Sequence, residues 1–295
     1  MTTIELDTSR SVASIIDSER TMEGGGFPVR RPFPTDTLMQ VDPFLLLDHL
    51  GPVTWRPGEG IGAPEHPHRG FETVTYLLSG EMEHKDSAGH AGKLASGDVQ
   101  WMSAGAGIVH SELPSPAFMR DGGVMHGFQI WVNLPARDKM MAPRYQEIPS
   151  ARIPTATSKD GRVRVKVIAG NALGVGAVIE TRTPIQYLHY TLQPGGETLQ
   201  MVPEAHNAMV YIVRGTARVG ADNREIREGQ LAVLGPGNAV RLANDINASE
   251  GVDLLVLSGV PIREPVARYG PFVMNSQDQI RQAIRDYQEG RLGRI

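Results

Sequence analysis

The segment Glu72-Thr-Val-Thr-Tyr-Leu-Leu-Ser-Gly80 is rich in β-branched and aromatic residues, and a similar segment, Asn207-Ala-Met-Val-Tyr-Ile-Val-Arg-Gly215, follows 135 positions later. Such runs followed by glycine favour β-strands that end in turns. Residues 96–105 and 228–237 form a second pair of similar segments, 132 positions apart. The two pairs predict two similar β-domains in tandem, because the small difference in offset is typical of a loop insertion.

The composition agrees with a fold built from strands and turns. The 33 glycines and 21 prolines make up about 18% of the 295 residues, against about 12% in average proteins. Short apolar runs, such as Thr73–Leu78, Val99–Met102 and Phe128–Leu134, are separated by clusters of Gly, Asp, Ser and Pro. This spacing predicts an all-β fold of the antiparallel barrel or sandwich type.

A proline-rich stretch lies between the two repeats. Pro135, Pro143, Pro149 and Pro154 stand among charged residues that show neither helical nor strand periodicity. We therefore expect an N-terminal domain over residues 1–134, a linker over 135–159 and a C-terminal domain over 160–295.

The C-terminal residues predict one amphipathic helix at about 276–289. Ser276 is a favourable N-cap with Gln279 at the capping-box position, and apolar residues recur at helical spacing from Ile280 to Tyr287. The opposite face carries charges of both signs. We expect this helix to end the C-terminal domain and to pack on protein rather than on a membrane.

Charge and cysteine content exclude several classes of function. The formal net charge is −4, so the chain has no basic excess for direct nucleic-acid binding. No cysteine is present, which excludes disulfides, thiolate metal sites and a cysteine nucleophile. The N-terminal residues 1–10 include charges where a signal peptide needs an apolar run, and no apolar run is long enough to span a membrane. These features predict a soluble, cytoplasmic protein.

Histidines are concentrated in one part of the chain: five of the nine lie between His66 and His110. In a strand, residues two apart point to the same face, so His66 and His68 can reach one metal ion. His110 and Glu112 repeat that spacing with a carboxylate. Two such strands facing each other would bring three imidazoles and one carboxylate together, a set that suits Fe(II), Mn, Co, Ni, Cu or Zn. The alternative is that these are ordinary surface or hydrogen-bonded histidines.

Longer motifs resemble a known family. Residues 60–72, followed by Gly80, resemble the first cupin motif, and residues 66–76, 97–112 and 129–135 resemble the pirin family. Residues 42–48 and 270–275 are also similar to pirins. The resemblance implies a bicupin, with two tandem jelly-roll-like cupin β-barrels. It also implies a non-haem Fe(II) in the N-terminal barrel, held by His66, His68, His110 and Glu112.

Glu72 is a second candidate carboxylate. It shares parity with His66 and His68, and many cupins have a glutamate ligand four residues after the second histidine. The pirin pattern favours Glu112 as the ligand, which leaves Glu72 to orient an imidazole or to form a structural hydrogen bond.

The ligand positions do not recur in the second repeat. The offsets map the three histidines and two glutamates onto Met201, Pro203, Asn207, Leu242 and Asn244. His189 and His206 are isolated in that half. We therefore expect no metal site in the C-terminal barrel.

Other residues around the predicted site have weaker signals. His84 and His90 fall in a polar stretch, residues 83–92, that is typical of an exposed loop. The residues that could line the pocket are His126, Gln129, Trp101, Phe128 and Trp131.

Two functions follow from the resemblance. Some pirins are quercetinases, which implies that a flavonol binds the metal and that dioxygen opens its ring with release of carbon monoxide. Glu112 or Glu72 would take the flavonol hydroxyl proton. Pirins are also metal-dependent regulators, which implies instead a redox-sensing partner of a transcription factor or metabolic enzyme. A pocket open to a bulky substrate favours the enzyme, and a sealed pocket favours the sensor.

Overall fold

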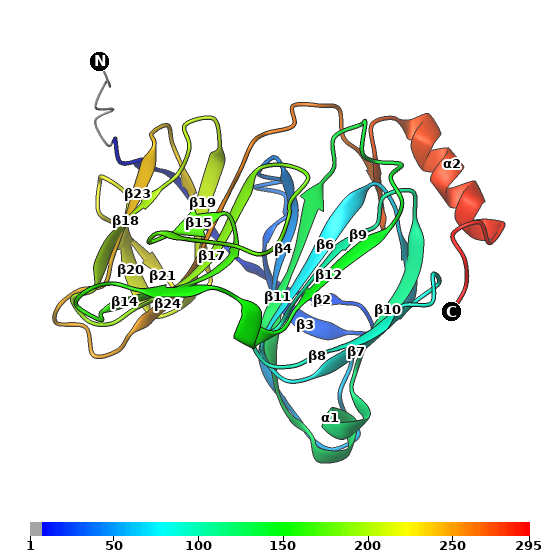
Figure 1. Cartoon of the computed structure of the whole chain (residues 1–295), viewed down its shortest axis with the longest axis horizontal. Coiled ribbons are helices and arrows are strands. Elements are labelled where there is room, and N and C mark those ends of the chain that lie inside the picture. Colours follow the sequence, from blue (N-terminus) through cyan, green and yellow to red (C-terminus); the bar gives the residue numbers. More distant parts are fainter. Residues whose placement is uncertain (1–7) are drawn as a thin grey trace. The chain divides into compact units, whose positions relative to one another are not determined.

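The computed structural model describes residues 8–295, and residues 1–7, on which part of the signal-peptide argument rests, lie outside the described residues. The chain forms two compact units. We call residues 19–35, 42–150 and 262–295 the first barrel, and residues 8–18, 36–41 and 151–261 the second barrel. Strands dominate both units (Figure 1).

The first barrel contains thirteen named strands and two α-helices, α1 (Pro116–Asp121) and α2 (Gln277–Gln288). Its strands are β2 (Glu19–Glu23), β3 (Phe27–Phe33), β4 (Phe44–Trp55), β5 (Ala63–His68), β6 (Phe71–Ser79), β7 (Met82–Asp86), β8 (Ala91–Leu94), β9 (Val99–Ser103), β10 (Ile108–Pro114), β11 (Gly123–Asn133), β12 (Arg144–Ile148), β25 (Ala267–Tyr269) and β26 (Phe272–Met274). They form a seven-stranded antiparallel sheet in the order β12-β9-β6-β11-β4-β3-β2, a four-stranded antiparallel sheet in the order β5-β10-β7-β8, and the hairpin β25-β26.

The second barrel repeats this arrangement. Its strands are β1 (Val12–Asp17), β13 (Thr155–Thr157), β14 (Val163–Ala169), β15 (Asn171–Ala172), β16 (Val175–Gly176), β17 (Ile185–Leu192), β18 (Glu197–Met201), β19 (Asn207–Arg214), β20 (Thr216–Val219), β21 (Arg224–Arg227), β22 (Gln230–Leu234), β23 (Ala239–Ala243) and β24 (Val252–Gly259); a short 3-10 helix, η1, spans Ser150–Arg152. Its sheets run β1-β22-β19-β24-β17-β14-β13 and β18-β23-β20-β21, with the hairpin β15-β16.

The sequence repeat is a structural repeat. The first pair of similar segments forms β6 and β19, each the third strand of its seven-stranded sheet. The second pair contains β9 and β22, each the second strand. The prediction of an all-β chain with two similar barrels is confirmed, and these strands are long enough to bury a two-sheet core.

The compact units differ from the expected boundaries at 1–134, 135–159 and 160–295. Strand β1, near the N-terminus, pairs with β22 in the second barrel. Strand β12 lies inside the expected linker, between Pro143 and Pro149, and pairs with β9. Residues 262–295 belong to the first barrel. These pairings join residues that are far apart in the sequence, so local composition carries no signal of them.

Helix α2 has the predicted ends but not the predicted location. Ser276 caps it, and Gln279 completes the capping box. Ile280 and Ala283 are buried against Val109 and Phe272, which belong to the first barrel. The helix therefore packs on the first barrel and does not end the second. No helix among residues 8–295 is long and apolar enough to cross a membrane.

The interiors of the two barrels differ. In the second barrel, aliphatic residues from both sheets, such as Val165, Val210 and Leu242, form one continuous buried core. Leu242, which the repeat aligns with His110, lies opposite Thr198. In the first barrel, part of the interior is a cavity of about 510 Å³ that contains polar residues. The second barrel is therefore filled by its own side chains, whereas the first has room for a ligand.

Candidate metal centre and pocket

Three histidines converge inside the first barrel. Strands β5 and β10 are antiparallel neighbours, with His66 directly opposite His110, and His68 lies two residues along β5 on the same face. Their ring centroids are 4.3 to 4.9 Å apart, and one nitrogen from each ring lies within 4.8 Å of the others. Among residues 8–295, this is the only group of three or more His, Cys, Asp or Glu side chains that could hold a metal ion.

The protonation states of these rings suit a metal ion. The Nδ1 of His66 donates to the carbonyl oxygen of Pro64 at 2.7 Å, which leaves the lone pair of Nε2 available. Burial lowers the pKa of His110 to about 4 and lowers the pKa of His68 well below its usual value. Both ring nitrogens of His110 are buried and have no hydrogen-bond partner in the described chain. The buried rings of His68 and His110, together with the Nε2 of His66, fit a first-row transition metal.

Glu112 lies beside the three histidines and belongs to a small hydrogen-bond network with Thr75 and Gln129. Its carboxylate accepts a hydrogen bond from the Thr75 hydroxyl at 2.9 Å, and the same hydroxyl is 2.6 Å from the side-chain oxygen of Gln129. One hydroxyl proton cannot serve two acceptors. With Glu112 ionised, the Gln129 amide must turn so that its NH2 group donates to Thr75. Glu112 is not one of the three residues whose ligand atoms converge, so its role as a ligand stays a prediction.

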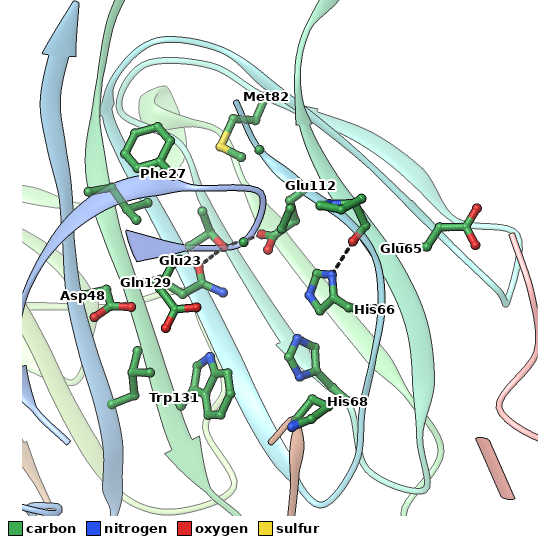
Figure 2. A pocket seen from close by; sticks show the side chains of 18 of the residues that line it. Glu23, Phe27, Asp48, Glu65, His66, His68, Met82, Glu112, Gln129 and Trp131 are labelled. Carbon is green, nitrogen blue, oxygen red and sulfur yellow. Dashed lines mark hydrogen bonds between the residues drawn. The ribbon is translucent and has the colours of Figure 1, made fainter. Parts of the chain in front are cut away.

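The cavity reaches this group from one side. Its lining includes His66, His68 and Glu112 (Figure 2). Mainly apolar side chains form the rest of its wall, and they come from β3, β4, β7 and β11: Phe27, Leu46, Leu50, Met82, Met125 and Trp131. The predicted aromatic wall is correct for Trp131, whereas Trp101 and Phe128 are buried in the barrel and do not line the cavity.

Part of the cavity wall carries charged side chains. Asp48 lines the cavity and forms a two-point ion pair with Arg31, at 2.7 and 2.6 Å. Burial raises the pKa of Asp48 to about 6, although Arg31 acts in the opposite direction. The Arg268 guanidinium lies 4.8 Å from the ring centre of Trp131. The sequence analysis included Asp48 only as the last of the pirin-like residues 42–48 and did not name Arg31 or Arg268, because their chain neighbours give no pattern that indicates an interior position.

Comparison with known proteins identifies the family. The sequence model described as Pirin matches residues 26–132, and the model described as Pirin C-terminal cupin domain matches residues 187–293. The chain belongs to the pirin family.

Relatives of this pirin cover nearly its whole length. A tomato (Solanum lycopersicum) pirin-like protein is 46% identical over 92% of this chain and 89% of the relative. A Pseudomonas aeruginosa protein, 43% identical over 93% of this chain and 95% of the relative, is named provisionally as a quercetin 2,3-dioxygenase. A crystal structure titled as quercetin 2,3-dioxygenase from Acinetobacter baumannii superposes with a TM-score of 0.89 and 36% identity, covering 96% of this chain and 98% of that chain.

The parity argument for Glu72 fails in this pirin. Gly70, with a φ of 88°, separates β5 from β6 and breaks the alternation that connected His68 with Glu72. On β6, Thr75 lines the cavity, and Glu72, three residues away, points to the other face. Its buried carboxylate accepts a hydrogen bond from the Ser103 hydroxyl. This hydrogen bond agrees with the structural role considered for Glu72; a role in proton transfer stays a prediction.

The remaining histidines of the pirin chain lie outside the group of three. His84 was expected in an exposed loop but is buried on β7, where its ring contacts the Glu147 carboxylate; His90 is exposed as expected. The error arose because alternating polar residues in a short hairpin strand have the composition of a loop. His126 does not line the cavity, and its Nε2 lies 2.7 Å from that of His49. His206 bonds to Ser258 in the second barrel.

Proposed function

We propose that this pirin is a metal-dependent flavonol dioxygenase of the quercetin 2,3-dioxygenase type. The observation that carries the proposal is the cavity of about 510 Å³, which opens onto His66, His68 and Glu112. Its volume is within the range of about 300–1,000 Å³ that is typical of small-molecule sites. A large, mainly apolar pocket beside three candidate metal ligands favours an enzyme with a bulky aromatic substrate over a redox sensor with a sealed pocket. The names of the Pseudomonas and Acinetobacter proteins support the same reaction.

The metal would be held by His66, His68 and His110, with Glu112 as the fourth ligand. We propose Fe(II), because three imidazoles and a carboxylate are ligands that iron accepts, and Mn, Co, Ni, Cu or Zn fit the same set. A first-row metal with open positions supplies Lewis acidity and a site for dioxygen and the flavonol oxygens.

The side chains of the pocket would bind and orient the flavonol. Phe27, Leu46 and Trp131 offer flat or aliphatic surface to its rings. Glu112 would take the proton of the flavonol hydroxyl, since its carboxylate faces the pocket and Thr75 holds it in place. Gln129, whose NH2 group donates to Thr75, would present its carbonyl oxygen to a ligand hydroxyl and its second N–H to a ligand oxygen.

Reconstitution under anaerobic conditions tests the proposal. The protein is loaded with Fe(II) and mixed with quercetin and dioxygen, while flavonol absorbance and carbon monoxide are followed. We expect one carbon monoxide for each flavonol consumed, turnover lost in His110→Ala, and turnover kept in His206→Ala, which alters a buried histidine of the second barrel.

One bound iron without any turnover would contradict the dioxygenase. That result would instead support the redox-sensing regulatory protein, which stays a prediction together with its protein partner, the absence of nucleic-acid binding and the cytoplasmic location.

A further inference from the structure

We propose that Asp286, on helix α2, is a positioning residue for the metal centre and acts through Arg69, the residue that follows His68. The inference rests on the metal site of the proposed function. It assigns to the C-terminal segment, residues 262–295, a role in holding the strands that carry the ligands.

Arg69 is fixed through both its side chain and its main chain. Its side chain is buried, and its Nη1 donates to the Asp286 carboxylate at 2.6 Å, while its Nε donates to the carbonyl oxygen of Ala106 at 2.6 Å. Its main-chain carbonyl accepts a hydrogen bond from the Val273 amide at 3.0 Å, which forms a bridge between the end of β5 and β26. Because His68 directly precedes Arg69 in the chain, its backbone position depends on these contacts.

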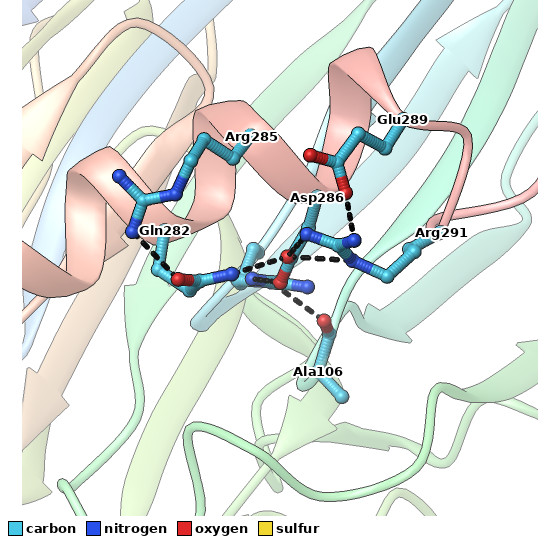
Figure 3. A network of polar contacts seen from close by, with 7 residues as sticks. Ala106, Gln282, Arg285, Asp286, Glu289 and Arg291 are labelled. Carbon is cyan, nitrogen blue, oxygen red and sulfur yellow. Dashed lines mark hydrogen bonds and ion pairs between the residues drawn. The ribbon is translucent and has the colours of Figure 1, made fainter.

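Asp286 is itself held by several donors. Gln282 and Arg291 both donate to its second carboxylate oxygen, at 2.6 and 2.8 Å respectively (Figure 3). Burial acts to raise the pKa of Asp286, but these bonds and the Arg69 bond outweigh it and lower the pKa to about 2. Asp286 therefore stays ionised and connected to Arg69 throughout the neutral pH range.

The same segment also contacts the other ligand strand. Val109, which precedes His110, packs in a buried cluster with Ile280, Ala283 and Leu292. The Ser87 hydroxyl accepts a bond from the Val109 amide at 3.1 Å and donates to the Leu292 carbonyl at 2.7 Å. The neighbours of His68 and His110 are thus both tied to the C-terminal segment. Metal affinity depends on how firmly the ligands are oriented, so loss of these contacts with the C-terminal segment should weaken metal binding.

Titration with Co(II) tests this role, because its visible spectrum reports the ligand geometry. We compare the wild-type protein with Asp286→Ala, with the conservative Asp286→Glu, and with Asp278→Ala as the matched control. Asp278 lies on the same helix, but its side chain is 85% exposed and pairs only with the exposed Arg281 among the ion pairs of the described chain. Arg291→Ala is added in case Asp286→Ala does not fold, since it removes one support of Asp286 at the surface.

We expect Asp286→Ala to weaken Co(II) binding by about tenfold or more, as loss of outer contacts does at other metal sites, and to change the Co(II) spectrum. Asp286→Glu should recover most of the affinity, Arg291→Ala should show a smaller loss, and Asp278→Ala should match the wild type. Wild-type affinity and spectrum in every folded Asp286 and Arg291 variant would overturn the inference, as would an equal loss in Asp278→Ala. A wild-type protein that binds no Co(II) would instead overturn the metal site itself.

Discussion

Thr75 has one hydroxyl proton and lies between Glu112, which accepts that proton, and the Gln129 amide, whose NH2 group donates to Thr75. It orders the carboxylate and the amide that face the pocket. Thr75 lies within the pirin-like residues 66–76, but that motif gave it no role of its own. It also illustrates why single residues of the site are hard to find in a sequence. The spacing of His66 and His68 follows the strand period, but the contact between Thr75 and Glu112 joins strands of different sheets.

Removal of the Thr75 hydroxyl should impair turnover. Thr75→Val keeps the shape but leaves Glu112 without its donor, and a hydrogen bond to a charged group contributes about 1.5–3 kcal/mol. We expect kcat/KM for quercetin to fall by about one to two orders of magnitude. Thr73→Val, on the same face of β6, is the matched control. Equal activity of the two variants would show that the hydroxyl does not matter.

His49 should make the stability of the first barrel depend on pH. Burial, His126 and Arg30 lower its pKa to about 3, so the folded state keeps this ring neutral. The unfolded chain takes up the proton at a pKa of about 6.5. The contribution of the neutral His49 ring to the free energy of unfolding is therefore fully present above pH 6.5 and decreases as the pH falls toward 3.

The corresponding measurement is denaturant unfolding of the metal-free protein between pH 7 and 4. His49→Gln should lower the slope of the unfolding free energy against pH by up to about 1.4 kcal/mol per pH unit, the value for one proton. His90→Gln, which alters an exposed histidine, should leave the slope unchanged. An identical slope in wild type and His49→Gln would refute the assignment.

At the scale of elements, helix α2 depends on its N-terminal cap. The Ser276 hydroxyl accepts from the Gln279 amide, and the Gln279 side chain bonds back to the Ser276 amide. Ser276→Ala should destabilise the first barrel by about 1 kcal/mol. Gln279→Ala removes the hydrogen bonds that its side-chain oxygen accepts from the Ser276 and Asn275 amides. Both bonds are exposed, so water can replace them and we expect a smaller effect. Thermal unfolding of both variants checks the order, and a larger loss in Gln279→Ala would contradict it.

Elements with a strong local signal could be predicted, and those that depend on a single backbone angle could not. The cap at Ser276 and the strand repeat in β6 and β19 are written in adjacent residues. The direction of Glu72 instead depends on the positive φ of Gly70, where a Cβ atom would meet the Val273 carbonyl oxygen. That constraint comes from β26, far along the chain, so parity alone gave the wrong face.

For the whole molecule, the two barrels share a topology but differ in what fills them. The sequence predicted the repeat and the absence of ligand residues around Leu242, because both follow from aligned positions. It did not predict that residues 262–295 complete the first barrel, since Arg69 and Asp286 are 217 residues apart and each alone resembles an ordinary surface charge.

Metal binding should therefore stabilise one barrel and not the other. A ligand that binds only the folded state stabilises the part of the structure that it contacts. Hydrogen exchange with and without Co(II) should show increased protection of amides in β5 and β10, and unchanged protection in β18 and β23. Equal protection of both pairs of strands would contradict the difference between the barrels.

Metal content per chain tests the central claim most directly. After anaerobic reconstitution and removal of free ions, elemental analysis should give about one metal per wild-type chain, the number implied by one competent group of three histidines. His66→Ala, His68→Ala and His110→Ala should each contain almost none, whereas His189→Ala and His206→Ala should match the wild type. A value near two, or an unchanged content in His110→Ala, would contradict the account.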